Sequence, residues 1–270
     1  MSSSRRDQLA TALQAQQERI QQLSGQTPAG IRGEGRLVRL LPVTKFFPAE
    51  DVALLHELGV RSVGENRDQE ASAKAASLGA SGLTDLEWHF IGQLQSKKAK
   101  SVVTYASWVH SLDRESVVRA LGRAMDAAAA RWEAEEGPRP AAGDHLNCLI
   151  QIDLDPQRDP RRPSHRGGAH PGALEELAEQ IAEHPRLHLA GVMAVAPQDV
   201  EAEAAFQRLW ELSAALRCSH PQAQEISAGM SGDVEAAIRW GSTLVRMGSA
   251  IMGSRPSPDQ GRHPTLPHSG

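Results

Sequence analysis

The stretch Leu37-Val-Arg-Leu-Leu-Pro-Val-Thr-Lys45 is a short apolar run, and a segment of helical period, Pro48–Leu58, follows it. The same alternation continues along the chain to about Met247. Apolar runs that alternate with helical segments are typical of βα units around a parallel sheet. We therefore predict strands near Leu37–Val43, Arg61–Val63, Trp88–Ile91, Trp108–His110, Asn147–Ile152, Leu189–Val195, Gln224–Ile226 and Thr243–Met247.

Helical patterns fill most of the intervals between these runs. Besides Pro48–Leu58, we expect helices over Arg67–Leu78, Arg114–Arg131, Pro171–His184, Val200–Arg217 and Asp233–Trp240. Eight strands with intervening helices predict an α/β fold, a single (β/α)8 TIM barrel, and 270 residues suit one such domain. A doubly wound open sheet is the alternative that the pattern leaves open.

Three kinds of segment fall outside the barrel pattern. Within residues 1–36, Gln8–Leu23 is a polar helix that we expect to pack against the barrel, which itself spans 37–255. Ala134–Asp144 and Asp155–Pro171 are rich in Pro, Gly and Arg and should be exposed loops. Residues 256–270 contain four prolines and few apolar side chains, so we expect a disordered tail.

Composition excludes several classes of protein. A net charge of -4 gives no electrostatic reason to expect nucleic acid or a membrane as the main partner. No run approaches the about 18 apolar residues that span a bilayer, and the first residues lack the apolar core of a secretory signal. The two cysteines, Cys148 and Cys218, form no CxxC pair, which argues against a disulfide framework or thiolate zinc site and favours a cytoplasmic location. Histidines in the loops and tail show no metal-ligand spacing, so we expect no metal.

Lys45 is the first candidate for chemistry. It closes the first strand and shares the face of Leu41 and Val43. In a barrel, an inward residue at the C-terminal end of a strand lies in the mouth where active sites form. Desolvation there lowers the pKa of the amine and makes it a nucleophile toward an aldehyde. The alternative is a surface lysine at a strand end.

Two small-residue segments, Ser227–Asp233 and Val245–Ala250, follow the seventh and eighth strands. Phosphate groups in α/β barrels frequently lie at these positions, where glycines let the backbone approach and a serine hydroxyl donates. Alternatively, Ser231 caps the helix Asp233–Trp240.

Arg246 ends the eighth strand, where a charged residue in an apolar run needs a partner. One partner would be the pyridine nitrogen of a bound ligand. Because a guanidinium has hydrogen-bond donors and no acceptor, it would keep that nitrogen unprotonated. A salt bridge to a barrel carboxylate is the alternative interpretation.

Weaker candidates are Asn66, Met193 and His89. Asn66 could contact a cofactor or cap the helix that begins at Arg67, and capping is the commoner role. Met193 could line a pocket, although methionine usually fills a core. His89, in an aromatic strand, is more often a hydrogen-bonded core residue than a ligand contact.

Five stretches in order resemble the pyridoxal phosphate homeostasis protein family, the single-domain relatives of the alanine racemase barrel. They spread from about Leu37 to Gly253. They are Pro42-Val-Thr-Lys45, Val63-Gly-Glu-Asn66, Glu87-Trp-His-Phe-Ile-Gly-Gln-Leu-Gln-Ser-Lys97, Gly229-Met-Ser-Gly-Asp-Val-Glu-Ala-Ala-Ile238 and Val245-Arg-Met-Gly-Ser-Ala-Ile-Met-Gly253.

The resemblance implies a fold-type III site for pyridoxal 5′-phosphate (PLP). Lys45 matches the lysine that forms the internal aldimine, Arg246 the arginine facing the pyridine nitrogen, and Ser231, Gly248 and Ser249 the phosphate-binding positions. Ser249 stands where the family often has threonine, which keeps the hydroxyl. The Arg158–His170 loop is longer and more basic than the family's, which leaves the role of that loop open.

The implied role is a reversible carrier of PLP in its homeostasis, with PLP and apo PLP-dependent enzymes as partners and a monomeric chain. An amino acid racemase-like enzyme is disfavoured because no second domain follows the barrel and the one tyrosine, Tyr105, precedes the fourth strand. A Schiff-base aldolase is the other alternative, and it requires a carboxylate or second lysine beside Lys45. Catalytic residues are therefore not assigned.

Overall fold

A computed structural model describes residues 4–32, 37–156 and 167–255. Its eight strands form one parallel sheet in the order β1-β8-β7-β6-β5-β4-β3-β2. A parallel bridge between Val43 and Gly64 joins the two ends of this order, which closes the sheet into a barrel. The strands are β1 Arg39–Pro42, β2 Ser62–Glu65, β3 Glu87–Phe90, β4 Ala106–Leu112, β5 Leu146–Ile152, β6 Leu187–Ala194, β7 Glu225–Ser227 and β8 Leu244–Met247.

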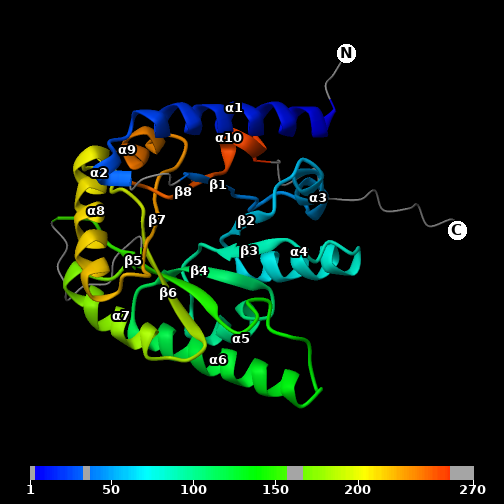
Figure 1. Cartoon of the computed structure of the whole chain (residues 1–270). Coiled ribbons are helices and arrows are strands. Elements are labelled where there is room, and N and C mark those ends of the chain that lie inside the picture. The colour runs from blue at the N-terminus through cyan, green and yellow to red at the C-terminus, as the bar shows by residue number, and fades with distance from the viewer. Residues whose placement is uncertain (1–3, 33–36, 157–166, 256–270) are drawn as a thin grey trace, which may run out of the picture.

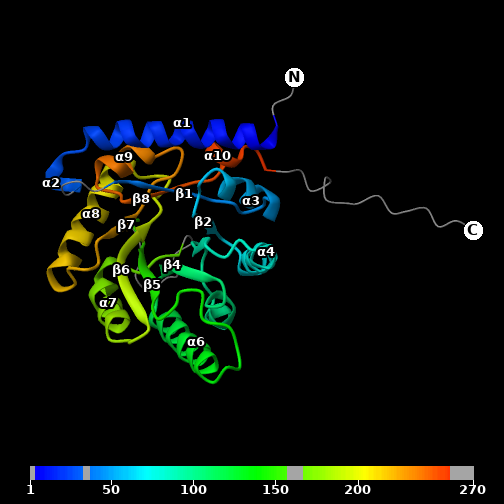
Figure 2. The same cartoon turned by 45° about the vertical axis from the view of Figure 1, so that its right-hand side comes forward.

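Helices surround the strands on the outside of this barrel (Figures 1 and 2). The longer helices are α1 Arg5–Gln26, α3 Ala49–Glu57, α4 Asp68–Ala80, α6 Glu115–Glu133, α7 Leu174–Ala182, α8 Ala202–Ser219 and α9 Val234–Arg239. The short ones are α2 Ala29–Arg32, η1 Ser96–Lys98, α5 Ala99–Val102, η2 Pro171–Ala173 and α10 Ser249–Met252.

The TIM barrel prediction is confirmed, and each expected strand and helix overlaps an observed one. The open-sheet alternative is wrong, because the Val43–Gly64 bridge and the hydrogen bond from Thr44 N to Gly64 O (3.0 Å) pair β1 with β2. The short helices α2, η1, α5 and α10 were not predicted, since three or four residues are too few to display a helical period.

The helix α1 packs on the barrel rather than standing apart from it. A capping box of Ser4 and Asp7 starts it, and its buried Leu9, Leu13 and Ile20 join a cluster of apolar side chains from α3, β8, α9 and α10. Both views show α1 lying across α9 and α10 (Figures 1 and 2). The division at residues 36 and 255 stays a prediction. The expected tail and most of the basic loop lie outside the described residues.

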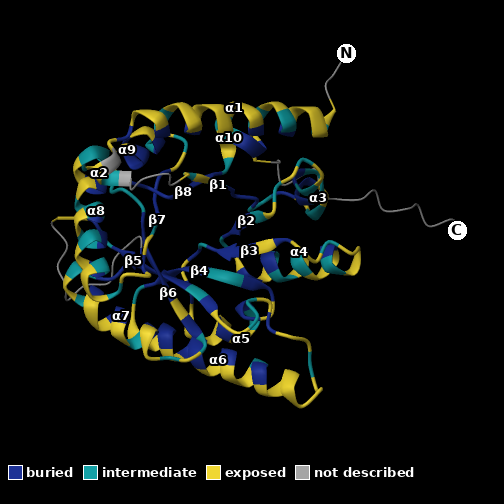
Figure 3. Cartoon of the chain, viewed as in Figure 1, coloured by how far each residue is buried: buried dark blue, intermediate teal, exposed yellow. Residues whose placement is uncertain are grey.

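The main core lies between the sheet and the surrounding helices. Buried residues occupy the strands and the helix faces that turn toward them (Figure 3). A small apolar cluster of Leu149, Ala190 and Met193 packs with Trp108 on the other face of the strands. Polar side chains fill much of the remaining barrel interior, including His89, His110, Ser227 and Arg246, all buried. No helix in the described ranges is long and apolar enough to cross a membrane.

Candidate PLP site

A cavity of about 360 Å³ opens at the C-terminal ends of the strands. Its floor comes from β6 and β8, and its rim comes from the segments that follow β1, β2, β7 and β8. The structure brings together in its lining all the residues predicted to bind the cofactor: Lys45, Asn66, Met193, Ser231, Arg246, Gly248 and Ser249.

Lys45 occupies a tight turn directly after β1. Phe47 N donates to Thr44 O at 3.1 Å, and Phe46 has a φ of 72°. This left-handed value suits the third position of a type II turn, where glycine is usual, so a phenylalanine there is strained. The carboxylate of Glu70 accepts from Phe46 N at 2.6 Å and holds the turn from α4. The backbone that carries Lys45 is thus fixed on both sides.

A buried ion network stands behind this turn. Lys74 Nζ on α4 donates to Glu65 Oε1 and Glu70 Oε1, both at 2.7 Å, and to Thr44 O at 2.9 Å. The Thr44 hydroxyl donates to the same Glu65 oxygen at 2.7 Å. Burial raises the pKa of Glu65, and the Lys74 ammonium opposes that shift. The network joins the end of β1 to β2 and α4.

The surroundings of Lys45 favour its uncharged amine. Burial lowers the pKa of Lys45, and the nearby Arg255 and Arg67 guanidinium groups lower it further. Both arginines lie over the Phe46 ring, at 4.4 Å and 4.9 Å from its centroid, and neither has a carboxylate partner among the described residues. The alternative of an ordinary surface lysine does not fit a partly buried amine inside a cavity.

Small residues and hydroxyls form the rim after β7 and β8. Ser231 and Ser249 line the cavity, and neither hydroxyl bonds to another described residue. The expectation that Ser231 caps the following helix is wrong. Asp233 holds the N-cap position, and its carboxylate accepts from Met230 N at 2.6 Å. The serine hydroxyls are therefore available to a ligand.

Arg246 is buried at the cavity floor and carries its charge without a counter-ion. Its Nη1 donates to Ser227 O and Ser227 Oγ, both at 2.7 Å, and its Nη2 donates to Ala194 O at 2.8 Å. The salt-bridge interpretation is wrong, since no carboxylate of the described residues lies within ion-pairing distance of this guanidinium. Burial lowers its pKa to about 10, so the group remains charged near neutral pH.

The weaker candidates divide between the cavity and the barrel interior. Asn66 does not cap α4, whose N-cap is Arg67, and its Oδ1 is buried without a hydrogen-bond partner among the described residues. Met193 is buried at the cavity wall. His89 does not contribute to the cavity lining, and its Nδ1 bonds to His110 Nε2 at 2.9 Å.

Sequence reasoning missed several residues at the site. Phe46 and Arg255 line the cavity, but an aromatic residue after a strand and an arginine near a tail carry no signal of their own. His110 and Ser227 were placed in or beside predicted strands without a role. Among the described residues no cluster of three histidine, cysteine or acidic side chains could hold a metal ion.

Comparison with known proteins places this barrel in a defined class. The family model for the alanine racemase N-terminal domain matches residues 12–256. Alanine racemase from Corynebacterium glutamicum shares the fold, with a TM-score of 0.61 and 14% identity over 94% of this chain and 62% of the racemase chain.

Closer relatives define the family within this class. Pyridoxal phosphate homeostasis proteins are 45% identical in Corynebacterium glutamicum, over 83% of this chain and 93% of the relative, and 37% identical in Escherichia coli, over 81% and 86%. The structure of PipY from Synechococcus elongatus, solved with PLP bound, has a TM-score of 0.66 and 31% identity over 87% of this chain and 99% of PipY. The chain belongs to the pyridoxal phosphate homeostasis protein family.

Proposed function

We propose that the protein binds PLP through a reversible Schiff base on Lys45 and holds it for release, as a carrier in PLP homeostasis rather than an enzyme. The observation that carries the proposal is the cavity itself. It combines a lysine amine of lowered pKa, two serine hydroxyls that bond to no other described residue, and a buried guanidinium without a counter-ion. These groups match the aldehyde, the phosphate and the ring nitrogen of PLP, and PLP-bound PipY supports the assignment.

Each predicted residue has a distinct part in this function. The uncharged amine of Lys45 attacks the aldehyde carbon, a carbon–nitrogen double bond forms, and the aldehyde oxygen leaves as water; hydrolysis reverses the reaction. Ser231, Gly248 and Ser249 bind the phosphate, and Asn66 and Met193 contact the remaining surface of the cofactor. When bound there, PLP would supply an aldehyde that condenses reversibly with a primary amine.

Arg246 disfavours chemistry that uses the cofactor ring as an electron sink. It only donates hydrogen bonds, so a ring nitrogen beside it stays unprotonated, and an unprotonated ring is a poor electron sink. A two-base racemase also needs a second acid or base in the cavity. The hydroxyl of Tyr105 contacts Asp68 at 3.5 Å outside the cavity lining, and burial raises its pKa.

The aldolase alternative has less support. Glu65, Glu70 and Lys74 lie near Lys45, but none of them lines the cavity, and Lys74 Nζ bonds to Glu65 Oε1 and Glu70 Oε1. An aldolase also gives no reason for an uncompensated guanidinium at the floor. Transfer of PLP to apo-enzymes, a monomeric state and a cytoplasmic location remain predictions.

The absorbance spectrum tests the Schiff base. After incubation with PLP, the protein should show a yellow band that borohydride bleaches, and Lys45→Ala should lose the band while the control Lys97→Ala keeps it. Mixing the loaded protein with an apo PLP-dependent enzyme should then restore that enzyme's activity. A protein that stays colourless with PLP would refute the cofactor assignment, and racemisation of alanine by the loaded protein would refute the carrier role.

A further inference from the structure

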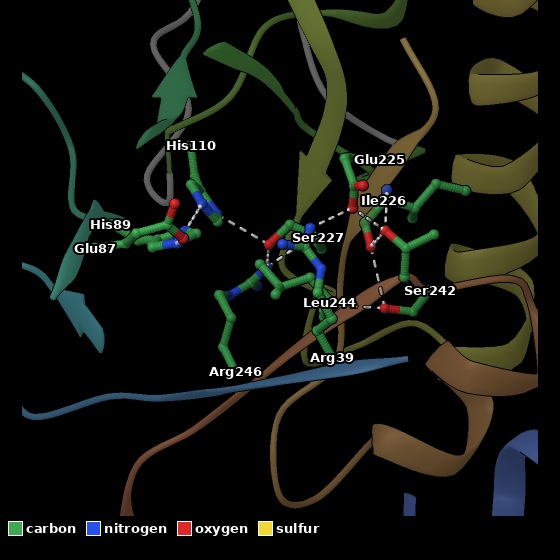
Figure 4. A network of polar contacts seen from close by, with 11 residues as sticks. Arg39, Glu87, His89, His110, Glu225, Ile226, Ser227, Ser242, Leu244 and Arg246 are labelled. Carbon is green, nitrogen blue, oxygen red and sulfur yellow. Dashed lines mark hydrogen bonds and ion pairs between the residues drawn. The ribbon is translucent and has the colours of Figure 1, made fainter. Parts of the chain in front are cut away.

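A chain of buried hydrogen bonds leads away from Arg246 through the inside of the barrel (Figure 4). Arg246 Nη1 lies 2.7 Å from Ser227 Oγ, which lies 3.0 Å from His110 Nδ1. His110 Nε2 in turn lies 2.9 Å from His89 Nδ1. These residues come from β8, β7, β4 and β3, so the chain crosses the barrel beneath the cavity.

The two ends of this hydrogen-bond chain favour one direction for its protons. A guanidinium only donates, so Ser227 Oγ accepts from Arg246 and its own proton is free to point to His110 Nδ1. In this arrangement a neutral His110 carries its proton on Nε2 and donates to His89 Nδ1. His89 carries its proton on Nε2, which lies 3.9 Å from Glu87 Oε2 and has no hydrogen-bond partner among the described residues.

Both histidines are therefore neutral members of an ordered chain. Burial lowers the pKa of His89 and of His110, and for His110 the nearby His89 and Arg246 add to the effect. A protonated His110 would present a second donor to Ser227 and place a charge beside an already unpaired guanidinium. The His89 ring also stacks on Trp108, with 5.2 Å between centroids and 3° between planes, which holds the far end of the chain.

Arg39 and Glu225, which lie near this hydrogen-bond chain, form an ion pair with each other. Arg39 Nη2 lies 2.8 Å from Glu225 Oε2, and the Arg39 guanidinium also lies over the Trp108 ring. Figure 4 shows Arg39, Glu87 and Glu225 around His89 and Ser227. No described carboxylate reaches Arg246 itself, so its bonding partners Ser227 and Ala194 are uncharged.

We propose that Ser227 and His110 are positioning residues that orient the Arg246 guanidinium toward the cofactor without neutralising it, and that His89 completes the chain. The proposal rests on the proposed function. A carboxylate at the same place would orient the guanidinium equally well but would cancel its field. An uncharged serine–histidine chain fixes the group and leaves its charge for the ligand.

The first test uses the protein without cofactor, so that it does not depend on PLP binding. Nitrogen NMR of histidine-labelled protein should find His110 and His89 as neutral rings with the proton on Nε2. In Ser227→Ala the Nδ1 signal of His110 should shift, because its donor is gone. A proton on Nδ1 of His110 in the unmodified protein would overturn the proposal, whatever happens with PLP.

The second test measures cofactor binding. Ser227→Ala and His110→Phe should weaken PLP binding by about tenfold and shift the absorbance maximum, because the guanidinium loses its fixed orientation. His110→Asn, which keeps an acceptor for the Ser227 hydroxyl, should recover part of the loss. Ser111→Ala is the matched control, since Ser111 is equally buried on β4 but its hydroxyl has no hydrogen-bond partner among the described residues.

The outcomes separate this inference from the proposed function. If the wild-type protein and all variants take up PLP with the same affinity and spectrum, the positioning role is refuted while the Schiff-base carrier stands. If the wild-type protein binds no PLP, the carrier fails, and the histidine tautomers still decide whether the chain is ordered as described.

Discussion

Lys45 has a lowered pKa although no dedicated base lies beside it. Burial contributes most, and the guanidinium groups of Arg255 and Arg67 add electrostatic repulsion, while Glu65 and Glu70 act in the opposite direction. Both arginines face the ring of Phe46 rather than a described carboxylate, so their charge is not cancelled locally. At the residue scale, the reactivity of the amine follows from this balance.

Removing one of these cations should raise the pKa of Lys45. We expect Arg67→Gln to shift the pH profile of Schiff-base formation toward higher pH, because the ammonium form loses a repelling neighbour and the free amine appears later as pH rises. The rate is measured with pyridoxal, which has no phosphate for the arginine to attract. Arg123→Gln, an exposed position on α6, is the control, and an unchanged or lower midpoint in Arg67→Gln would contradict the assignment.

The serine hydroxyls of the rim should distinguish phosphorylated from unphosphorylated ligand. Ser231→Ala and Ser249→Ala should each weaken PLP binding by about tenfold or more, the effect of one hydrogen bond to a charged group. Binding of pyridoxal should hardly change. Titration of the absorbance band measures both, with Ser254→Ala as a control outside the cavity lining. Equal losses for the two ligands would mean that these serines do not hold the phosphate.

At the scale of elements, the turn after β1 depends on α4. The strained Phe46 backbone is held by Glu70, and Lys74 links Glu70 to Glu65 and to Thr44. Lys74 is 7% exposed, so its charge is compensated almost entirely by this network. The helix therefore positions Lys45 indirectly, by fixing the backbone on either side of it.

Breaking this network should destabilise the fold. Lys74→Met leaves the Glu65 carboxylate buried without its cation, which costs about 3–5 kcal/mol in the free energy of unfolding. The double variant Lys74→Met, Glu65→Gln should recover much of that loss, because the buried charge is gone. Urea unfolding measures both. Lys97→Met, at an exposed position, should change stability by less than about 0.5 kcal/mol.

At the scale of the whole molecule, α1 lies outside the barrel and contacts two helices, α3 and α10, that are next to the cavity-lining segments after β1 and β8. Arg5 on α1 bonds to both carboxylate oxygens of Asp51 on α3, at 3.0 Å and 2.6 Å, and to Met252 O on α10 at 3.1 Å. Its guanidinium also lies 5.6 Å from the Phe47 ring centroid. The helix thus connects the segment after β1 to the segment after β8.

Loss of apolar contact under α1 should affect stability strongly. We expect Leu13→Ala to reduce the free energy of unfolding by about 2–5 kcal/mol, since Leu13 is buried against the barrel. Gln17→Ala, exposed on the same helix, should be nearly neutral. Chemical unfolding of both variants checks this, and equal stability would mean that α1 does not form part of the cooperative unit.

Much of the architecture and of the site could be predicted from the sequence, because the C-terminal ends of parallel strands lie at the same end of a barrel. Lys45, Arg246 and Ser249 could be placed at that end of the barrel from strand order alone. The capping roles expected of Ser231 and Asn66 were wrong because each following helix takes its N-cap from a later residue, Asp233 and Arg67.

Other features depend on contacts that no local pattern shows. Lys74 has a helical position typical of a surface lysine, and only the packing of α4 on β2 turns its ammonium inward. The His89–His110 pair requires the register of β3 against β4, in which His89 lies beside Trp108. Long-range pairing of this kind appears only when the chain is folded.

The contact between Arg5 and Met252 has a consequence for biosynthesis. The cavity is lined by Lys45, early in the sequence, and by Ser249 and Arg255, late in the sequence. Apart from its contacts with α3, α1 packs on α9 and α10, which are also late in the sequence. Until Arg255 has been translated, α1 therefore has part of its apolar face uncovered and the cavity is incomplete. A ligand of this cavity would therefore meet a complete set of contacts only after synthesis has passed Arg255.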